Sequence, residues 1–158
     1  MSTSWDEVAQ RVRDELRSAL TYIPSSKITV IPSISDYFAN NTAQTVIDDL
    51  VILIAPSANG SESKEPRLSG YFRKRFEVEI AVVSKMDVNA IARIWGTGKK
   101  GIFDVANDVV TALEHKNLGG FAENKSGANF EVPWNMLPLD GRAFTGYQTT
   151  YTVVKIEK

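Results

Sequence analysis

The strongest constraint on the fold is the period-two pattern of side chains in residues 71–84. One face collects the apolar residues Phe72, Phe76, Val78, Ile80 and Val82, while the charged residues Arg73, Arg75, Glu77 and Glu79 fall on the other face. A helix would scatter these apolar residues around its axis, whereas a strand places them on one face. The segment therefore predicts a half-buried strand with a charged outer face. At about 3.3 Å per residue it would span roughly 45 Å, so we expect its ends to project as an arm or hairpin.

Two other segments have the spacing of amphipathic helices. In residues 102–113 one apolar stripe contains Ile102, Val105, Ala106, Val109, Val110 and Leu113. Near the start of the chain, Ser4 and Glu7 have the spacing of a capping box. The stripe that follows ends before Pro24 and contains Trp5, Val8, Val12, Leu16, Ala19 and Leu20. We expect both helices to pack on the sheet.

The remaining elements complete an α+β pattern. Residues 27–31 and 45–55 predict strands that are each stopped by a proline, and residues 144–156 have the β-branched and aromatic composition of a final strand. Shorter elements are predicted as strands at 120–125 and 129–134, a turn or short helix at 35–41, and a short helix at 86–95. Residues 1–158 thus predict a single α+β domain. Its sheet is mainly antiparallel or mixed, with long strands and a projecting hairpin, and two main helices pack on one face.

Residues 56–70 separate two of the predicted long strands. The segment is polar and contains two prolines and two glycines. These features are typical of a mobile hairpin loop. Loops of this length in compact domains are usually functional or disordered, so we also consider that a neighbouring subunit orders this one.

Composition excludes several classes of function. The 158 residues include 18 basic and 19 acidic side chains, and the formal net charge of -1 gives no general attraction to nucleic acid or to anionic lipid. The absence of cysteine excludes disulfides, a cysteine nucleophile and thiolate metal sites. The first residues lack a signal-peptide pattern, and no apolar run is long enough for a membrane span. We therefore expect a soluble protein without a membrane partner.

The sharpest enzyme-like pattern is the glycine-rich segment from Gly96 to Gly101. It matches G-x-G-x-x-G, it opens a predicted helix, and Glu123 lies where an acid could bind a ribose. The segment before it favours a helix rather than a buried strand, however, and the chain lacks the alternating strand and helix order of a dinucleotide-binding fold. A flexible connector is the favoured interpretation. A Walker motif is excluded because no Ser or Thr follows the lysines at the required position.

Other candidate chemistry is sparse. His115 is the single histidine and is predicted at a helix end, where a cationic cap is favoured over a ligand or catalytic role. Glu77 and Glu79 could form a carboxylate pair, but Arg73 and Arg75 share their strand face, which favours a solvated or subunit-facing charge ladder. We therefore assign no catalytic, metal-binding or cofactor-binding residue and expect no cofactor.

The order of these elements resembles the tail terminator, or tail completion, proteins of tailed bacteriophages. The segments that show the likeness most closely are RFEVEIAVV, GIFDVANDVVTALE and GYQTTYTVVKI. The resemblance implies a structural virion protein, not an enzyme. It would form a hexameric ring on the head-proximal end of the tail tube, stop tail polymerisation and present the head-joining surface. The implied partners are further copies of the chain, the tail tube protein, the head–tail connector or neck protein and the tape measure protein, with DNA only passing through the lumen.

On this hypothesis the assembly surface comprises residues 56–70, including Arg67, together with Arg73, Arg75, Glu77 and Glu79 on the predicted strand. Deleting residues 57–69 should then leave a folded monomer that forms no rings. Within the same class, another neck or head-completion protein or a tail-tube protein is the alternative. From other classes, a small nucleotide-binding enzyme that uses residues 96–101 and a cellular adaptor domain remain open.

Overall fold

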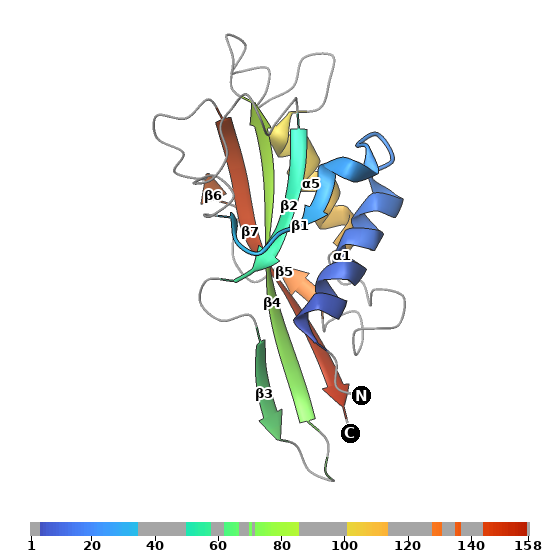
Figure 1. The fold of residues 1–158 in the computed structure, drawn as a ribbon, viewed down its shortest axis with the longest axis vertical. Helices are drawn as coiled ribbons and strands as arrows, with labels where there is room; N and C mark the ends of the chain where they lie inside the picture. Colours follow the sequence, from blue (N-terminus) through green and yellow to red (C-terminus); the bar gives the residue numbers. More distant parts are fainter. Residues whose placement is uncertain are drawn as a thin grey trace.

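One β-sheet and two helices make up the fold (Figure 1). The computed structural model describes residues 4–34, 50–57, 62–66, 70, 72–85, 101–113, 128–130, 135–136 and 144–157. The helices are α1 (Trp5–Ala19) and α5 (Ile102–Leu113), with a 3₁₀ turn η1 (Ser25–Lys27). The strands are β1 (Ile28–Val30), β2 (Leu50–Pro56), β3 (Glu62–Pro66), β4 (Phe72–Lys85), β5 (Ala128–Phe130), β6 (Asn135–Met136) and β7 (Phe144–Glu157).

The seven strands form one mixed sheet whose main path runs β1-β2-β4-β7-β5, with β3 added beside β4 and β6 beside β7. β1 and β2 are parallel, and every other described pair is antiparallel. β4 and β7 pair along all of their 14 residues, from Phe72 opposite Glu157 to Lys85 opposite Phe144. The predicted α+β class, the mixed sheet and the long strands are therefore confirmed.

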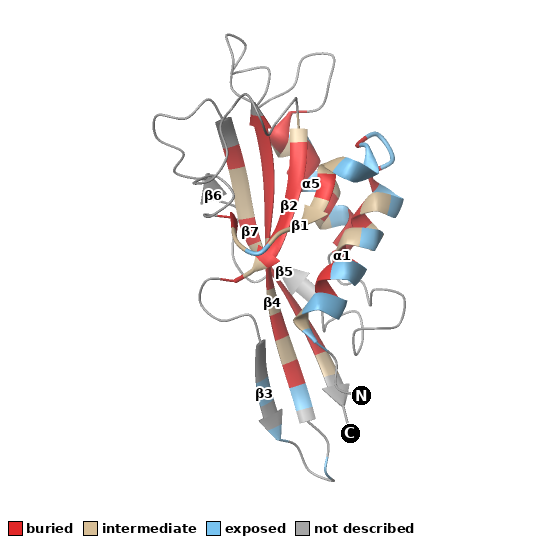
Figure 2. Cartoon of the chain, in the orientation of Figure 1, coloured by how far each residue is buried: buried red, intermediate tan, exposed pale blue. Residues whose placement is uncertain are grey.

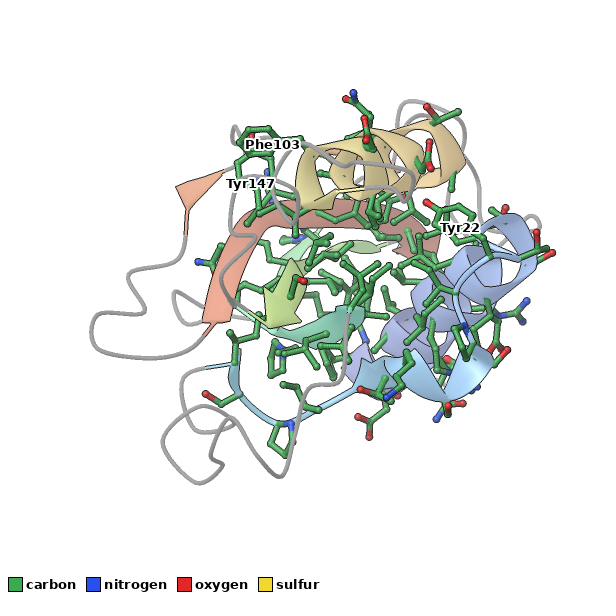
Figure 3. The ribbon with its side chains drawn as sticks, turned by 90° about the horizontal axis from the view of Figure 1, so that it is seen from above. Tyr22, Phe103 and Tyr147 are labelled. Carbon is green, nitrogen blue, oxygen red and sulfur yellow. The ribbon has the colours of Figure 1, made fainter. Side chains whose placement is uncertain are left out.

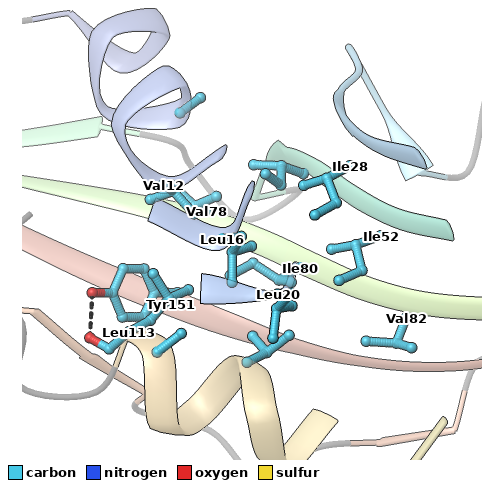
Figure 4. Packing of buried hydrophobic residues seen from close by; sticks show 14 of the residues in the cluster. Val12, Leu16, Leu20, Ile28, Ile52, Val78, Ile80, Val82, Leu113 and Tyr151 are labelled. Carbon is cyan, nitrogen blue, oxygen red and sulfur yellow. Dashed lines mark hydrogen bonds between the residues drawn. The ribbon is translucent and has the colours of Figure 1, made fainter. Parts of the chain in front are cut away.

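Both helices pack on the same face of this sheet and enclose the main core (Figures 2 and 4). Every second residue of β4 from Phe76 to Val82 faces this core and is fully buried. The helices contribute the apolar stripes predicted from the sequence, including Val8, Val12 and Leu16 of α1 and Ile102, Val105, Val109 and Leu113 of α5. One predicted member of the first stripe, Ala19, is exposed instead, because α1 ends there and the chain turns away.

α1 is fixed to the sheet at both of its ends. At the start, the Ser4 hydroxyl accepts a hydrogen bond from the Glu7 backbone N–H at 3.4 Å, and the indole N–H of Trp5 donates to the Glu77 carbonyl at 3.2 Å. In the last turn, the Arg17 guanidinium donates two hydrogen bonds to the Ile28 carbonyl, at 2.8 and 3.2 Å. The helix therefore spans the sheet from β4 to β1, and Arg17 binds the Ile28 carbonyl on the edge strand β1.

Aromatic side chains fix α5 in a similar way (Figure 3). The Tyr151 hydroxyl of β7 donates to the Leu113 carbonyl at 2.7 Å in the buried core. At the other end of α5, the rings of Phe103 and Tyr147 pack at a centroid distance of 4.9 Å. Tyr147 is thus a packing residue.

The predicted strand at residues 71–84 has the right extent but only part of its outer face is charged. Arg73 is exposed and Arg75, Glu77 and Glu79 are half-buried, yet Ala81 and Val83 on the same face are fully buried. They lie beside Val51 and Leu53 of β2, which are also buried, so this half of the sheet has apolar residues on both faces. The charged outer face is therefore confined to residues 73–79.

Residues 56–70, predicted as a mobile hairpin loop, contain a strand in the part that the structure describes. Residues Glu62–Pro66 form β3, which pairs antiparallel with β4 from Phe72 to Phe76. Gly70, in the turn that joins β3 to β4, has a φ of 78°, in the left-handed region that glycine adopts without strain. Strand pairing therefore overrides a sequence of low β-propensity here.

The shorter predicted elements have mixed outcomes. The strands expected at 27–31 and 144–156 appear as β1 and β7, and β2 occupies the last part of the range 45–55. The candidate at 129–134 overlaps β5 at residues 129–130. The elements predicted at 35–41, 86–95 and 120–125 lie outside the described residues.

Candidate functional site

The most distinctive surface of the molecule is the arm, which we define as β3, residues 72–76 of β4 and residues 153–157 of β7. Figure 1 shows it extending away from the part of the sheet that the helices cover. It is built by β4 and β7, which continue beyond β2, while β3 replaces β2 along the same edge of β4. The arm is therefore a three-stranded extension of the core sheet rather than a separate hairpin.

Four of the five residues predicted for the assembly surface lie together on one face of β4, at the arm and its base. The Arg75 guanidinium and the Glu77 carboxylate form an ion pair at 3.4 Å, with 38% and 29% of their side chains exposed. A pair this exposed contributes on the order of 0–1 kcal/mol to stability. This ion pair therefore contributes little to the stability of the fold. Arg67 lies outside the described residues.

A second row of charges on the arm was not predicted from the sequence. Lys74 pairs in register with Lys64 of β3 and with Lys155 of β7, so one lysine from each strand lies in a single row across the arm. Lys74 in the middle is only 4% exposed, and its Nζ lies 5.9 Å from the centroid of the Phe76 ring, a cation–π distance. The signal in the sequence was the position of Lys74 in the apolar series between Phe72 and Phe76.

The three lysines place positive charges at opposed positions of neighbouring strands, and each of them also takes part in further interactions. Directly opposite residues in antiparallel strands have Cβ atoms about 5 Å apart, so like charges at such positions oppose the pairing unless other contacts offset them.

The glycine-rich segment is not supported as a phosphate site by the part that is described. Gly101, its last residue, donates its backbone N–H to a carboxylate oxygen of Asp104 at 3.4 Å, so an acidic side chain already lies at the start of α5. A negative charge there occupies the helix end that would otherwise attract a phosphate. In addition, the strands on either side of α5 in sequence, β4 and β5, are separated in the sheet by β7. Residues 96–100 lie outside the described residues.

The other candidate chemical groups are not brought together. Within the described ranges, no group of three or more His, Asp or Glu side chains could hold a metal ion. His115 and Glu123 lie outside those ranges. No helix among the described residues is long and apolar enough to cross a membrane.

Two tyrosines have raised pKa values for structural reasons. Burial in the core raises the pKa of Tyr151 above its ordinary range, and the charge of Glu15 adds to the effect. Burial also raises the pKa of Tyr22, together with the hydrogen bond that its hydroxyl donates to Asp108. Both phenols therefore stay protonated and join elements of the fold by hydrogen bonds. Tyr151 joins β7 to α5, and Tyr22 joins the segment after α1 to α5.

Comparison with known proteins gives no relative: a scan against protein-family models and a search of curated proteins each found no match to this chain. The functional argument therefore depends on the geometry of the arm and on the resemblance in element order.

Proposed function

We propose that this protein is a structural virion subunit, the tail terminator of a tailed bacteriophage. In this role it forms a ring, with six copies expected, on the head-proximal end of the tail tube. The ring stops polymerisation of the tube and presents the surface to which the head, through its connector or neck protein, is joined.

The observation that carries the proposal is the arm. The helices and the main core cover the part of the sheet in which β4 pairs with β2, and β4 and β7 then continue to the end of the arm. Such an extension adds strand edges and charged surface to the molecule. A subunit that assembles side by side with its neighbours uses both features, because edges pair with strands and charges fix the partner.

The resemblance in element order adds support that is independent of the arm. It covers both helices, the long paired strands and the β-rich end of the chain, all of which are elements of the observed fold. No specific observation on the described residues favours the nucleotide-binding alternative, since Asp104 already lies at the start of α5.

The first test is the assembly state of the purified protein and its action on tail tubes. Light scattering with negative-stain images should give a mass of about six subunits and rings with a central hole. Because a terminator can also close its ring only on the tube, purified tail tubes should be incubated with the protein as well. Tubes that are capped at one end and no longer elongate are the expected result. A protein that neither forms rings nor caps tubes would overturn the proposal.

Charge reversal tests whether the predicted surface acts in this assembly. The double variant Arg73→Glu/Arg75→Glu should assemble at least about tenfold more weakly, because four negative charges would replace a row of two positive and two negative ones. Its melting temperature should change little, since the surface ion pair adds little stability. Arg13→Glu is a matched control, because Arg13 is also a partly exposed, ion-paired arginine but lies on α1 rather than on β4. Equal assembly of variant and control would remove these residues from the interface.

Deletion of the segment before β4 gives a second test of the same surface. Ser57 is 9% exposed and its backbone N–H donates to the Glu77 carbonyl at 3.4 Å, so the deletion is better started at residue 58. Removing residues 58–69 eliminates β3, and because Ser57 lies beside Glu77, residues 70–76 must then form the connection, so the arm part of β4 is released while the pairing of β2 with residues 78–84 can remain. A folded monomer is expected, and rings formed by this deletion variant would refute the assignment.

A further inference from the structure

The hydroxyl of Thr152 on β7 is buried and has no hydrogen-bond partner in the part of the chain that the structure describes. Thr152 is 1% exposed and lies between Tyr151 and Val153, whose side chains belong to the main core. Because successive residues of a strand point to opposite faces, Thr152 lies on the other face of the sheet, together with Arg75 and Glu77 of β4. A buried hydroxyl without a partner lowers the stability of the fold.

Glu77 is the residue of β4 directly opposite Thr152. The Cβ atoms of directly opposite residues are about 5 Å apart, a distance that a glutamate side chain can span. The Glu77 carboxylate instead pairs with the guanidinium of Arg75, two residues away on the same strand, at 3.4 Å. Charge-assisted hydrogen bonds between such groups are typically about 2.7–2.9 Å long, so this ion pair is a loose one. The carboxylate thus has two donors within its reach.

The backbone at Glu77 is fixed independently of its side chain. Its carbonyl accepts hydrogen bonds from the indole N–H of Trp5, at 3.2 Å, and from the backbone N–H of Ser57, at 3.4 Å. The side chain is 29% exposed, and rotamer changes of partly exposed side chains require no unfolding. The carboxylate can therefore turn from Arg75 towards Thr152 while the strand stays in place.

We infer that Glu77 is an exchangeable partner of Arg75. When a carboxylate of another copy of the chain binds the Arg75 guanidinium, Glu77 turns away and accepts a hydrogen bond from the Thr152 hydroxyl. The exchange leaves neither charge without a partner and satisfies the buried hydroxyl, so it lowers the cost of binding. The exchange within one subunit does not depend on the proposed function. The assignment of the incoming carboxylate to a neighbouring copy rests on that function.

Thermal melts of the isolated protein test the starting state. Thr152→Val keeps the shape and β-branching of the side chain but removes the hydroxyl, so it should raise the melting temperature by about 2–4 °C. Thr150→Val is the matched control, because Thr150 lies on the same face of β7 but is only half-buried, and it should change the melting temperature little. A lower melting temperature for Thr152→Val would show that the hydroxyl is already satisfied and would overturn the inference.

Removal of the arginine tests the exchange itself. Arg75→Met represents the state in which the guanidinium is engaged elsewhere. In this background Glu77 should bind Thr152, so the further change Thr152→Val should lower the melting temperature instead of raising it. In the control background Arg73→Met it should still raise it, because the ion pair of Glu77 is with Arg75. An equal rise in both backgrounds would overturn the exchange.

High salt provides the same test without a change at Arg75. Salt at about 1 M screens a partly exposed ion pair, so Glu77 should be released from Arg75. The rise in melting temperature caused by Thr152→Val should then be smaller than in low salt. A rise that salt leaves unchanged would contradict the exchange even if Arg75→Met failed to fold.

Assembly of the subunits tests the source of the incoming carboxylate. Thr152→Val removes the second position of Glu77, so association should weaken about tenfold although the isolated subunit is more stable. Thr152→Ser keeps the hydroxyl and should assemble normally. A residue that only packs would not change stability and association in opposite directions. Normal assembly of Thr152→Val would exclude a carboxylate of another copy as the partner of Arg75. If the natural sequence neither forms rings nor caps tubes, the proposed function fails instead, and the melts still decide the exchange.

Discussion

At the scale of single residues, the hydroxyl of Tyr151 is the most consequential polar group in the core. It is fully buried, and it satisfies the carbonyl of Leu113 at the end of α5. A buried carbonyl without a partner costs more than the net gain from a typical hydrogen bond. This one contact therefore ties the second helix to the strand that forms the arm.

Tyr151→Phe should lower the free energy of unfolding by about 1–2 kcal/mol, because it leaves the Leu113 carbonyl without its donor. Urea unfolding at neutral pH measures the change. Tyr22→Phe is the matched control, since Tyr22 is 46% exposed and water can replace its hydrogen bond to Asp108. A cost at position 22 as large as that at 151 would contradict the burial argument.

The same tyrosine predicts a dependence on alkaline pH. Burial raises the pKa of Tyr151 in the folded state above its ordinary value of about 10, so the unfolded chain loses the phenolic proton first. The resulting stability is fully present below pH 10 and is lost as the pH rises above it. Unfolding curves from about pH 8 to about pH 11 should therefore show a shallower decline for Tyr151→Phe than for the natural sequence. Equal declines in the stability of the two proteins would show that other titratable groups dominate the loss.

At the scale of elements, the sequence predicted those with strong periodicity and failed where pairing decides the structure. β4, α1 and α5 have long stripes of apolar residues, and their positions agree with the prediction. β3 could not be predicted because its sequence, Glu-Ser-Lys-Glu-Pro, has low β-propensity, and it becomes a strand only through its pairing with β4. The lysine row was missed for the same reason, since register between distant strands cannot be read from one strand.

The candidate site, too, could be predicted only where strand periodicity alone decides the arrangement. The alternation in β4 placed Arg73, Arg75, Glu77 and Glu79 on one face correctly, because that depends only on the strand period. The burial of Ala81 and Val83 on that face depends on β2, a neighbour that periodicity does not reveal.

Hydrogen exchange should distinguish β3 from the middle of β4. Residues 78–84 of β4 lie between β2 and β7, whereas β3 has one described neighbour. Amides of β3 are thus expected to exchange much faster than those in the middle of β4, because an edge opens at lower cost. Exchange measured by NMR or mass spectrometry on the isolated protein tests this. Protection of β3 equal to that of β4 would mean that its edge is already covered.

At the scale of the whole molecule, the fold combines a conventional core with an extension that the core does not require. The helices cover one face of the sheet, and β4 and β7 then leave that covered region together (Figure 2). Because the arm and the core share these two strands, the arm has a fixed direction relative to the helices. That rigidity suits a subunit that must meet its neighbours at a defined angle.

The nucleotide-binding alternative makes its own prediction at this scale. A ligand that binds only the folded state raises its melting temperature by mass action. Because Asp104 lies at the start of α5, we expect millimolar NAD or ATP to leave the melting temperature unchanged. A clear rise with either ligand in a thermal-shift measurement would revive the enzyme hypothesis, and loss of that rise in a Lys99→Ala/Lys100→Ala variant would locate the site.

The place of β7 in the sheet has a consequence for the order of events during synthesis of the chain. β7 is the last described strand in the sequence, yet it lies between β4 and β5, and its pairing with β4 joins residues as distant as Phe72 and Glu157. A growing chain on the ribosome therefore holds β4 with one side open until β7 has been made. The pair of β4 and β7, which runs through both the core and the arm, is therefore complete only after residues 144–157 have been translated.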